Sequence, residues 1–344
     1  MPATLSLLTA THRDDQRAKA VGIWAGVAGS GAVIGMLGSG TLLHFWSWRS
    51  IFWAFAVSAA VLAVTFGFVE ARRRHPLLDV RLFRKPDFAT GSATITVFFL
   101  AMFGFFFLIM QYIQLVMGYS PIQTAFALSP LMVPMLTLSA LAHWYLPRMG
   151  LRLVVFVGLL LISVGFLCLR VLQLHSPYWD MMWPLLVMST GIGFCTAPST
   201  FAIMAAVPDE KQGVASAVND TTREVGAALG IALAGSILAA RYTHAIASHL
   251  AAFPQPLRAP ASHSLAQALQ VAKTLGPQGA QLAELSQIAF LRAMESSLLV
   301  MGVIIAVAAL VIGAWAPGRD GQQLRPVRRI ASLRRGDAAG RNQA

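Results

Sequence analysis

Eight runs of about twenty apolar residues divide most of the chain, and they constrain its fold more than any other feature. A helix that rises about 1.5 Å per residue needs roughly 20 residues to cross a hydrocarbon core of about 30 Å. Backbone polar groups find no water there, so each run is predicted to be a helix that satisfies its own hydrogen bonds. The predicted spans are Ala20–Leu43, Ile51–Val69, Phe88–Met117, Pro121–Leu146, Leu153–Leu169, Met181–Val207, Gly213–Ala240 and Leu298–Ala316.

The composition agrees with a membrane protein. Of the 344 residues, 56% are hydrophobic and only 12% are charged, against about 25% charged in soluble domains. The net charge of +12 would also suit nucleic acid. The basic residues, however, lie between the spans rather than on one face, so no nucleic-acid partner is expected. The chain is predicted to be an all-α polytopic bundle in a lipid bilayer.

The distribution of basic residues predicts the orientation of the spans. One set of connectors and the two ends of the chain hold 19 of the 26 lysines and arginines. Basic flanks stay on the cytoplasmic side of a membrane, so both termini are expected there, in a multi-pass protein of the cell membrane. The most basic connector, residues 71–87, also carries apolar side chains and is predicted to lie along the inner leaflet as an amphipathic linker.

No pattern of a soluble enzyme occurs in the chain. The GxSxG, HExxH, Walker and CxxC motifs are missing from the sequence, so we expect no enzyme activity. The histidines at 244, 249 and 263 have poor ligand spacing and no nearby cysteine or carboxylate companions, so neither a metal site nor a cofactor is expected.

Charges inside the spans mark the candidate site, because ionisable groups in a membrane are costly and tend to face a cavity. Asp220, Arg223 and Glu224 follow Asn219 near the start of the seventh span. Their spacings of three and four residues allow one helical face and mutual neutralisation. Two interpretations stay open: a salt bridge that orients the helix at the inner interface, or a polar patch along a substrate or proton path. Either way, the three are predicted to face the bundle interior.

Two glutamines form a second polar pair within the spans. Gln111 and Gln114 lie three residues apart, late in the third span. They are predicted either to line a cavity or to bond across helices. Prolines inside the fourth and sixth spans, at 130, 134, 184 and 198, are typical of the kinked helices that line transporter clefts.

Four stretches resemble one known family. They are GAVIGMLGSG (31–40) followed by WRSIFW, QYIQLVMGYSP (111–121), PRMGLR (147–152) and PDEKQGVASAVNDTTREVGAALGIALAG (208–235). Together they are similar to the major facilitator superfamily, in its fourteen-span drug:proton antiporter branch. In the first stretch, helix packing through the antiporter motif is assigned to Gly31, Gly35, Met36, Gly38 and Gly40. Met36 stands where the family has proline, which weakens the bend implied there.

The resemblance implies a division of the chain. Residues 1–70 look like a remnant of the first helix bundle, residues 71–87 the linker and residues 88–316 the complete second bundle of six helices. Within that bundle, residues 241–290 are expected to form a long extracytoplasmic loop with short surface helices at 264–275 and 280–288. Residues 317–344 are expected to be a disordered basic cytoplasmic tail. Compared with the family, the chain looks shortened both at its start and internally, after WRSIFW.

The resemblance also implies the function. It predicts a proton-coupled exporter of drugs or other small amphipathic compounds, with Asn219, Asp220, Arg223, Glu224, Gln111 and Gln114 along the substrate or proton path. The alternative is a shortened paralogue without independent transport. Alternating access uses two helix bundles, so the incomplete first bundle predicts that this chain alone does not catalyse coupled export. Exposed helices rich in small residues would also allow self-association.

Overall fold

The computed structural model describes residues 49–72, 80–208, 212–250, 253 and 255–318. The chain forms two compact units. The first comprises residues 1–82 with 207–218, and the second comprises residues 83–206 with 219–344. In the first unit, α3 (Arg49–Arg72) covers the predicted span Ile51–Val69. The predicted span Ala20–Leu43 lies outside the described residues.

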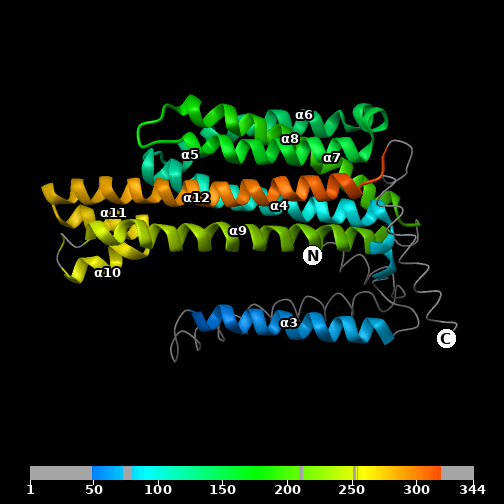
Figure 1. Ribbon diagram of the computed structural model, residues 1–344, viewed down its shortest axis with the longest axis horizontal. Coiled ribbons are helices and arrows are strands. Elements are labelled where there is room, and N and C mark those ends of the chain that lie inside the picture. The colour runs from blue at the N-terminus through cyan, green and yellow to red at the C-terminus, as the bar shows by residue number, and fades with distance from the viewer. Residues whose placement is uncertain (1–48, 73–79, 209–211, 251–252, 254, 319–344) are drawn as a thin grey trace, which may run out of the picture. The chain divides into compact units, whose positions relative to one another are not determined.

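The second unit is a bundle of long helices (Figure 1). Six helical segments in the described part of the chain are long and apolar enough to cross a membrane, and they correspond to the last six predicted spans. The elements in order are η1 (Val80–Arg84), α4 (Pro86–Gln111), η2 (Tyr112–Val116), α5 (Pro121–Leu128), η3 (Ser129–Leu131), α6 (Met132–Ala140), α7 (Ala142–Cys168), η4 (Leu169–Val171), α8 (Tyr178–Ala205), α9 (Gln212–Leu250), α10 (Gln255–His263), α11 (Leu265–Thr274) and α12 (Pro277–Trp315).

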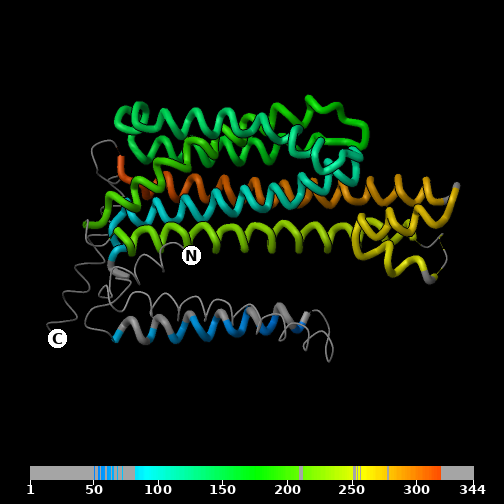
Figure 2. Tube along the Cα trace, turned by 180° about the vertical axis from the view of Figure 1, so that it is seen from behind, coloured from blue at the N-terminus to red at the C-terminus, as the bar shows by residue number. Residues whose placement is uncertain are grey.

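The core of the bundle lies where α8 packs against α4, α6 and α7, and where α12 packs against α4 and α7. Front and back views show these helices running side by side (Figures 1 and 2). Phe105 of α4 meets Phe166 of α7 edge to face, with ring centroids 6.4 Å apart. The buried hydroxyl of Ser163 in α7 donates to the carbonyl of Gly302 in α12 over 2.8 Å. The helices of the core are thus held together by hydrogen bonds between helices as well as by apolar packing.

The fourth span is divided, as its prolines suggest. Ser120 caps α5 in a reciprocal capping box with Gln123, and Pro121 occupies the first turn, an arrangement that satisfies the free N–H groups at a helix start. A 3₁₀ turn containing Pro130 then leads into α6. The helix ends at Ala140 rather than at the predicted Leu146, because Leu141 leaves helical geometry.

The connection after α6 is mostly helical. Residues 142–149 form the first part of α7, and Gly150, with φ 78° and ψ 157°, bends the chain before the span proper. Glycine adopts a positive φ without a steric cost. The apolar stretch around Tyr145 reads as membrane-spanning in the sequence, whereas in the structure it packs Tyr145 and Val154 into a cluster with Phe194 of α8.

The predicted loop 241–290 is largely helical. Helices α9 and α12 each run for 39 residues, longer than the roughly 20 needed to cross a bilayer. Tyr242, Ile246 and Leu250 are buried at intervals of four residues, which extends α9 well past its predicted end at Ala240. The predicted helix 264–275 is confirmed by α11, which Ser264 caps. Residues 280–288 instead belong to α12.

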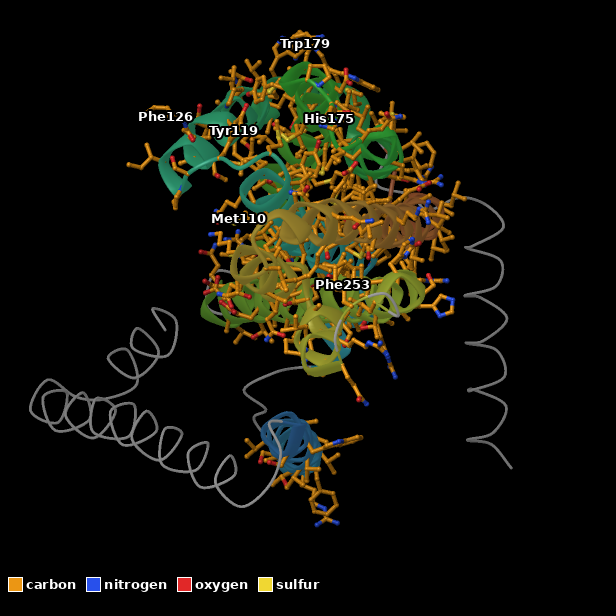
Figure 3. The ribbon with its side chains drawn as sticks, turned by 90° about the vertical axis from the view of Figure 1, so that its left-hand side faces the viewer. Met110, Tyr119, Phe126, His175, Trp179 and Phe253 are labelled. Carbon is orange, nitrogen blue, oxygen red and sulfur yellow. The ribbon has the colours of Figure 1, made fainter. Side chains whose placement is uncertain are left out.

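Helices α10 and α11 form a cap on the end of the bundle where α12 begins, and Figure 3 looks onto this end. The Tyr242 hydroxyl donates to the carbonyl of Ala261 over 3.1 Å. Gln287 of α12 donates to the carbonyl of Leu115 in η2 over 2.9 Å. The aromatic side chains of Phe126 and Trp179 are exposed at the same end, as expected where a helix bundle meets a membrane–water interface.

Candidate functional site

A group of polar side chains lies on α4, α8 and α9, near the end of the bundle at which both α4 and α9 begin (Figure 1). Hydrogen bonds join Thr200, Asn219 and Arg223. We add the buried Ser92 and Ser199, because Ser199 precedes Thr200 and Ser92 follows Gly91, which packs against the Ser199 carbonyl. We call these five residues the inner polar cluster. Two of its residues belong to the set proposed from the sequence. Ser92, Ser199 and Thr200 were missed, because a hydroxyl inside an apolar span is more often bonded to its own helix.

Close contact between α4 and α9 positions the Arg223 side of the cluster. A Cβ atom at Gly226 would collide with the carbonyl oxygen of Thr96, and one at Gly230 with that of Leu100. Small residues at a spacing of four allow this approach of two membrane helices. Since Ser92 precedes Thr96 by one turn of α4, it lies on the face that approaches α9.

The contacts of Arg223 are long and incomplete. Its Nη2 donates to Thr200 Oγ1 over 3.4 Å, and Thr200 Oγ1 donates to Asn219 Oδ1 over 3.5 Å. Good hydrogen bonds of these types are about 2.7–3.2 Å long. The guanidinium carbon lies 5.4 Å from the centroid of the Phe99 ring, within the range of a cation–π interaction.

Three buried polar atoms of the cluster make no hydrogen bond to any described residue: Ser92 Oγ, Ser199 Oγ and Arg223 Nε. Buried polar atoms are normally paired, so such a group calls for an explanation such as water or an ion. Two unpaired hydroxyls on α4 and α8, the helices that Arg223 contacts, and the unpaired Arg223 Nε fit hydration or a bound polar ligand.

The expected neutralisation of Arg223 by its neighbouring carboxylates does not occur in the structure. Among the described residues, no ion pair within 4.0 Å joins Arg223 to Asp220 or Glu224. Asp220 and Arg223 are half-buried, Asn219 is buried and Glu224 is exposed. The reason is direction: Arg223 points across to α8 and α4, toward Thr200 and Phe99, whereas Glu224 occupies the adjoining, exposed face of α9.

Within the described part of the chain, one ion pair forms between helices elsewhere in the bundle. Arg170 of η4 donates to Glu295 of α12 over 2.7 Å, with both side chains partly exposed. A pair of this kind contributes about 1 kcal/mol or less. It joins the end of α7 to α12, and the sequence contained no local pattern that linked residues so far apart.

An apolar cavity of about 300 Å³ lies between α4, α8 and the α5–α6 segment. We call it the methionine pocket. Methionine is flexible and polarizable, so it fits ligands of varied shape. The pocket is lined chiefly by Met102, Phe105, Phe106, Ser129, Met132, Met135, Met188 and Ser189.

The two glutamines have different surroundings. Gln111 donates to the carbonyl of Phe107 in its own helix over 2.9 Å, and among the described residues it has no hydrogen bond to another helix. Gln114 belongs to the π-helix η2 and lines a cavity of about 520 Å³ beside α11 and α12. Single π-turns occur often at functional sites. The packing-motif residues Gly31, Gly35, Met36, Gly38 and Gly40 lie outside the described residues.

Comparison with known proteins decides the family. The family model of the Major Facilitator Superfamily matches residues 1–231. The chain belongs to the Major Facilitator Superfamily. The fold agrees: a crystal structure of a bacterial homologue of the human lysosomal transporter Spinster, inward-facing and unoccupied, superposes with a TM-score of 0.53 at 16% identity. That likeness covers 91% of this chain and 74% of the homologue.

Three relatives with similar sequences are named as resistance or efflux proteins. Multidrug resistance protein Stp of Mycobacterium tuberculosis is 27% identical over 318 residues, covering 74% of this chain and 59% of Stp. Methyl viologen resistance protein SmvA of Salmonella typhimurium is 27% identical over 382 residues, covering 92% and 76%. Multidrug efflux pump LfrA of Mycolicibacterium smegmatis is 25% identical over 375 residues, covering 91% and 74%.

These alignments bear on the internal shortening inferred from the sequence. The aligned lengths of 382 and 375 residues for SmvA and LfrA exceed the 344 residues of the whole chain. Within the aligned regions, SmvA and LfrA therefore contain residues without a counterpart here. The chain itself spans 59% of the length of Stp.

Proposed function

We propose that this member of the Major Facilitator Superfamily is a proton-coupled exporter of small amphipathic compounds in the cell membrane. The observation that carries the proposal is the methionine pocket, about 300 Å³ in volume, inside a bundle related to multidrug resistance proteins. A promiscuous binder benefits from a flexible, methionine-rich surface that repacks around different ligands.

The inner polar cluster supplies the polar part of the proposed path. Arg223 is half-buried and lacks a carboxylate partner among the described residues. A cation in that setting attracts whichever carboxylate comes close, and Asp220 and Glu224 are three residues before it and one after it. We propose that proton binding to these carboxylates changes their pairing with Arg223 during the transport cycle, which couples proton and substrate.

The orientation follows from charge. Arg84, Lys85, Arg148 and Arg152 lie at the end of the bundle where α4 begins, and basic flanks favour the cytoplasm. We propose that this end is cytoplasmic and that the α10–α11 cap is extracytoplasmic. Both termini are then cytoplasmic, and the compounds and protons exchange across the bilayer between these two ends.

Transport by the full chain tests the proposal. The purified protein in proteoliposomes is expected to drive ethidium accumulation when a pH gradient is imposed, and to lose it when the gradient is collapsed with nigericin. The shortened-paralogue alternative predicts no gradient-dependent accumulation, and so does the expectation from the sequence that this chain alone does not catalyse coupled export. That result, with protein correctly inserted, would contradict export by this chain.

The methionine pocket provides a specific variant. Met188→Trp adds a large ring to a residue that is fully buried and lines the pocket, so it is expected to reduce ethidium accumulation. Met204→Trp, on the same helix outside the pocket, is the matched control. Equal accumulation by the Met188→Trp variant and the unchanged protein would exclude the methionine pocket as the substrate site.

A further inference from the structure

The inner polar cluster holds buried hydrogen-bond donors without partners beside a cationic side chain. Ser92 is 3% exposed and Ser199 is fully buried, yet neither hydroxyl makes a hydrogen bond to a described residue. Arg223 Nε is buried and unpaired in the same way. We propose that the cluster binds a small inorganic anion with a single charge, of the size of chloride. The proposal adds a ligand to the cluster of the proposed function, but neither its contacts nor its test depends on export.

The register of α4 against α9 places Ser92 and Arg223 at one level of the bundle. The two helices begin at the same end and run in the same direction (Figure 1). Gly226 of α9 packs against the carbonyl of Thr96 in α4. Ser92 lies four residues before Thr96, and Arg223 lies three residues before Gly226. Both are therefore about one helical turn from this contact, on the side of the helix starts.

Helix α8 brings Ser199 to the same level. A Cβ atom at Gly91 would lie 2.9 Å from the carbonyl oxygen of Ser199, so Ser199 lies beside the residue that precedes Ser92. The next residue of α8, Thr200, accepts the 3.4 Å hydrogen bond from Arg223. Three helices thus contribute the unpaired hydroxyls and the guanidinium to one region of the bundle.

The charge of Arg223 favours an anion over water alone. Among the described residues, neither Asp220 nor Glu224 forms an ion pair with Arg223 within 4.0 Å. A charge taken out of water is normally paired, because it loses its hydration. Water would satisfy the hydrogen bonds of the cluster but leave the charge uncompensated. An anion accepts hydrogen bonds from the guanidinium and the hydroxyls and also neutralises the charge.

The packing around the cluster determines the size and charge of the anion. Glycines on both sides, Gly91 toward α8 and Gly226 toward α9, hold α4 close to its neighbours. The ring of Phe99 lies 5.4 Å from the guanidinium carbon and supplies no hydrogen-bond donor. Such close helices fit a single atom better than a carboxylate that carries a chain. One guanidinium compensates one negative charge, and a further buried charge would be costly.

Thermal unfolding in detergent measures anion binding without transport. A ligand that binds only the folded protein raises the melting temperature as its concentration increases. At constant ionic strength, replacement of sodium gluconate by sodium chloride is expected to raise the melting temperature with saturation, because gluconate is too large for the cluster. Equal melting temperatures in the two salts at all mixing ratios would overturn the proposal.

Variants of the cluster locate the chloride. Arg223→Gln removes the charge and is expected to raise the chloride concentration for half of the shift by about tenfold or more, the factor for a hydrogen bond to a charged group. Ser199→Ala removes one neutral donor and is expected to raise it by about threefold. Arg292→Gln, at an exposed arginine of α12, and Ser286→Ala, at a buried serine of α12, are the matched controls. Both are expected to leave the concentration unchanged.

The outcomes separate this inference from loss of fold and from export. Each variant is compared with itself in gluconate, so a lower stability of the variant does not imitate a loss of chloride binding. An unchanged chloride concentration for half of the shift in Arg223→Gln, or in Ser199→Ala if Arg223→Gln does not fold, would overturn the site. A chloride shift that depends on these residues, in protein that does not accumulate ethidium, would support the anion site and count against export. Ethidium accumulation without any chloride shift would contradict the anion site alone.

Discussion

At the scale of single residues, Arg223 is the side chain on which proposed function depends most. Replacing it by alanine removes the cation between Thr200 and Phe99. Export by the Arg223→Ala variant is expected to fall on the order of tenfold, which corresponds to about 1.4 kcal/mol, while the amount of protein in the membrane stays nearly the same. Accumulation in proteoliposomes and quantitative immunoblots measure the two effects.

A second variant separates the effect of the charge at position 223 on export from the effect of the side-chain shape. Arg223→Lys keeps the positive charge but loses the planar fork that reaches Thr200 and stacks on Phe99, so partial export is expected. Arg292→Ala removes an exposed arginine of α12 that lies far along the chain from the cluster, and it is expected to export normally. A full loss of protein rather than of export in the Arg223→Ala variant would assign this residue to folding.

The sequence predicted Arg223 but not its partners. A sequence shows which charged residues are close along one helix, so Asp220 and Glu224 were the expected partners of Arg223. The structure turns the guanidinium to Thr200 and Phe99 instead. These residues come from other helices, and only the packing of α4, α8 and α9 brings them close.

At the scale of elements, the contact between α4 and α9 depends on glycine. Gly230 faces the carbonyl of Leu100 so closely that a methyl group does not fit. Gly230→Ala is therefore expected to lower the free energy of unfolding by about 1–3 kcal/mol, as overpacking of a tight core does. Thermal unfolding in detergent checks this prediction.

A neighbouring glycine provides the control for that substitution. A Cβ atom at Gly235 would lie 3.3 Å from the ring of Phe107, and a ring edge moves aside more easily than backbone. Gly235→Ala is expected to change stability much less than Gly230→Ala. Equal melting temperatures for the two variants would show that backbone contact does not determine how closely α4 and α9 approach.

The cap gives a second prediction at this scale. Tyr242→Phe removes the hydroxyl that donates to the carbonyl of Ala261 in the buried interior, and a net loss of about 1 kcal/mol is expected. The adjacent Thr243 donates to the carbonyl of Ser262 on the exposed side, so Thr243→Val is expected to cost less. Limited proteolysis of residues 251–276 measures the opening of the cap, and faster cleavage in the Thr243→Val variant would contradict this ranking.

Hydropathy predicted the positions of most membrane helices, because a run of about twenty apolar residues is visible in the sequence without knowledge of tertiary contacts. Helix α8, for example, begins three residues before the predicted Met181 and ends two before the predicted Val207. The extension of α9 was not predicted, since residues 241–250 mix polar and apolar side chains and read as a loop. Tyr242, Ile246 and Leu250 form a buried apolar face. This face predicts a helix only when the cap that covers it is known.

At the scale of the whole molecule, membership of the family does not by itself show that the chain is sufficient for transport. The family model matches residues 1–231, and the second unit contains five of the six described candidate spans whole and the sixth from Asn219 onward. Alternating access in this superfamily uses two bundles with substrate between them. Transport by the purified protein tests whether this chain is sufficient for such a cycle.

The orientation of the whole bundle is the last prediction, and it rests on the distribution of 26 basic residues. Moving basic flanks across a membrane is unfavourable, so the connectors that carry most of them stay in the cytoplasm. In a cysteine-free background, a thiol introduced by Ala259→Cys on the exposed surface of α10 is expected to react with an impermeant maleimide in intact cells. A thiol introduced by Ser332→Cys is expected to react only after the cells are opened. The reverse pattern would place the cap in the cytoplasm and the inner polar cluster on the outer side, and it would contradict the proposed orientation.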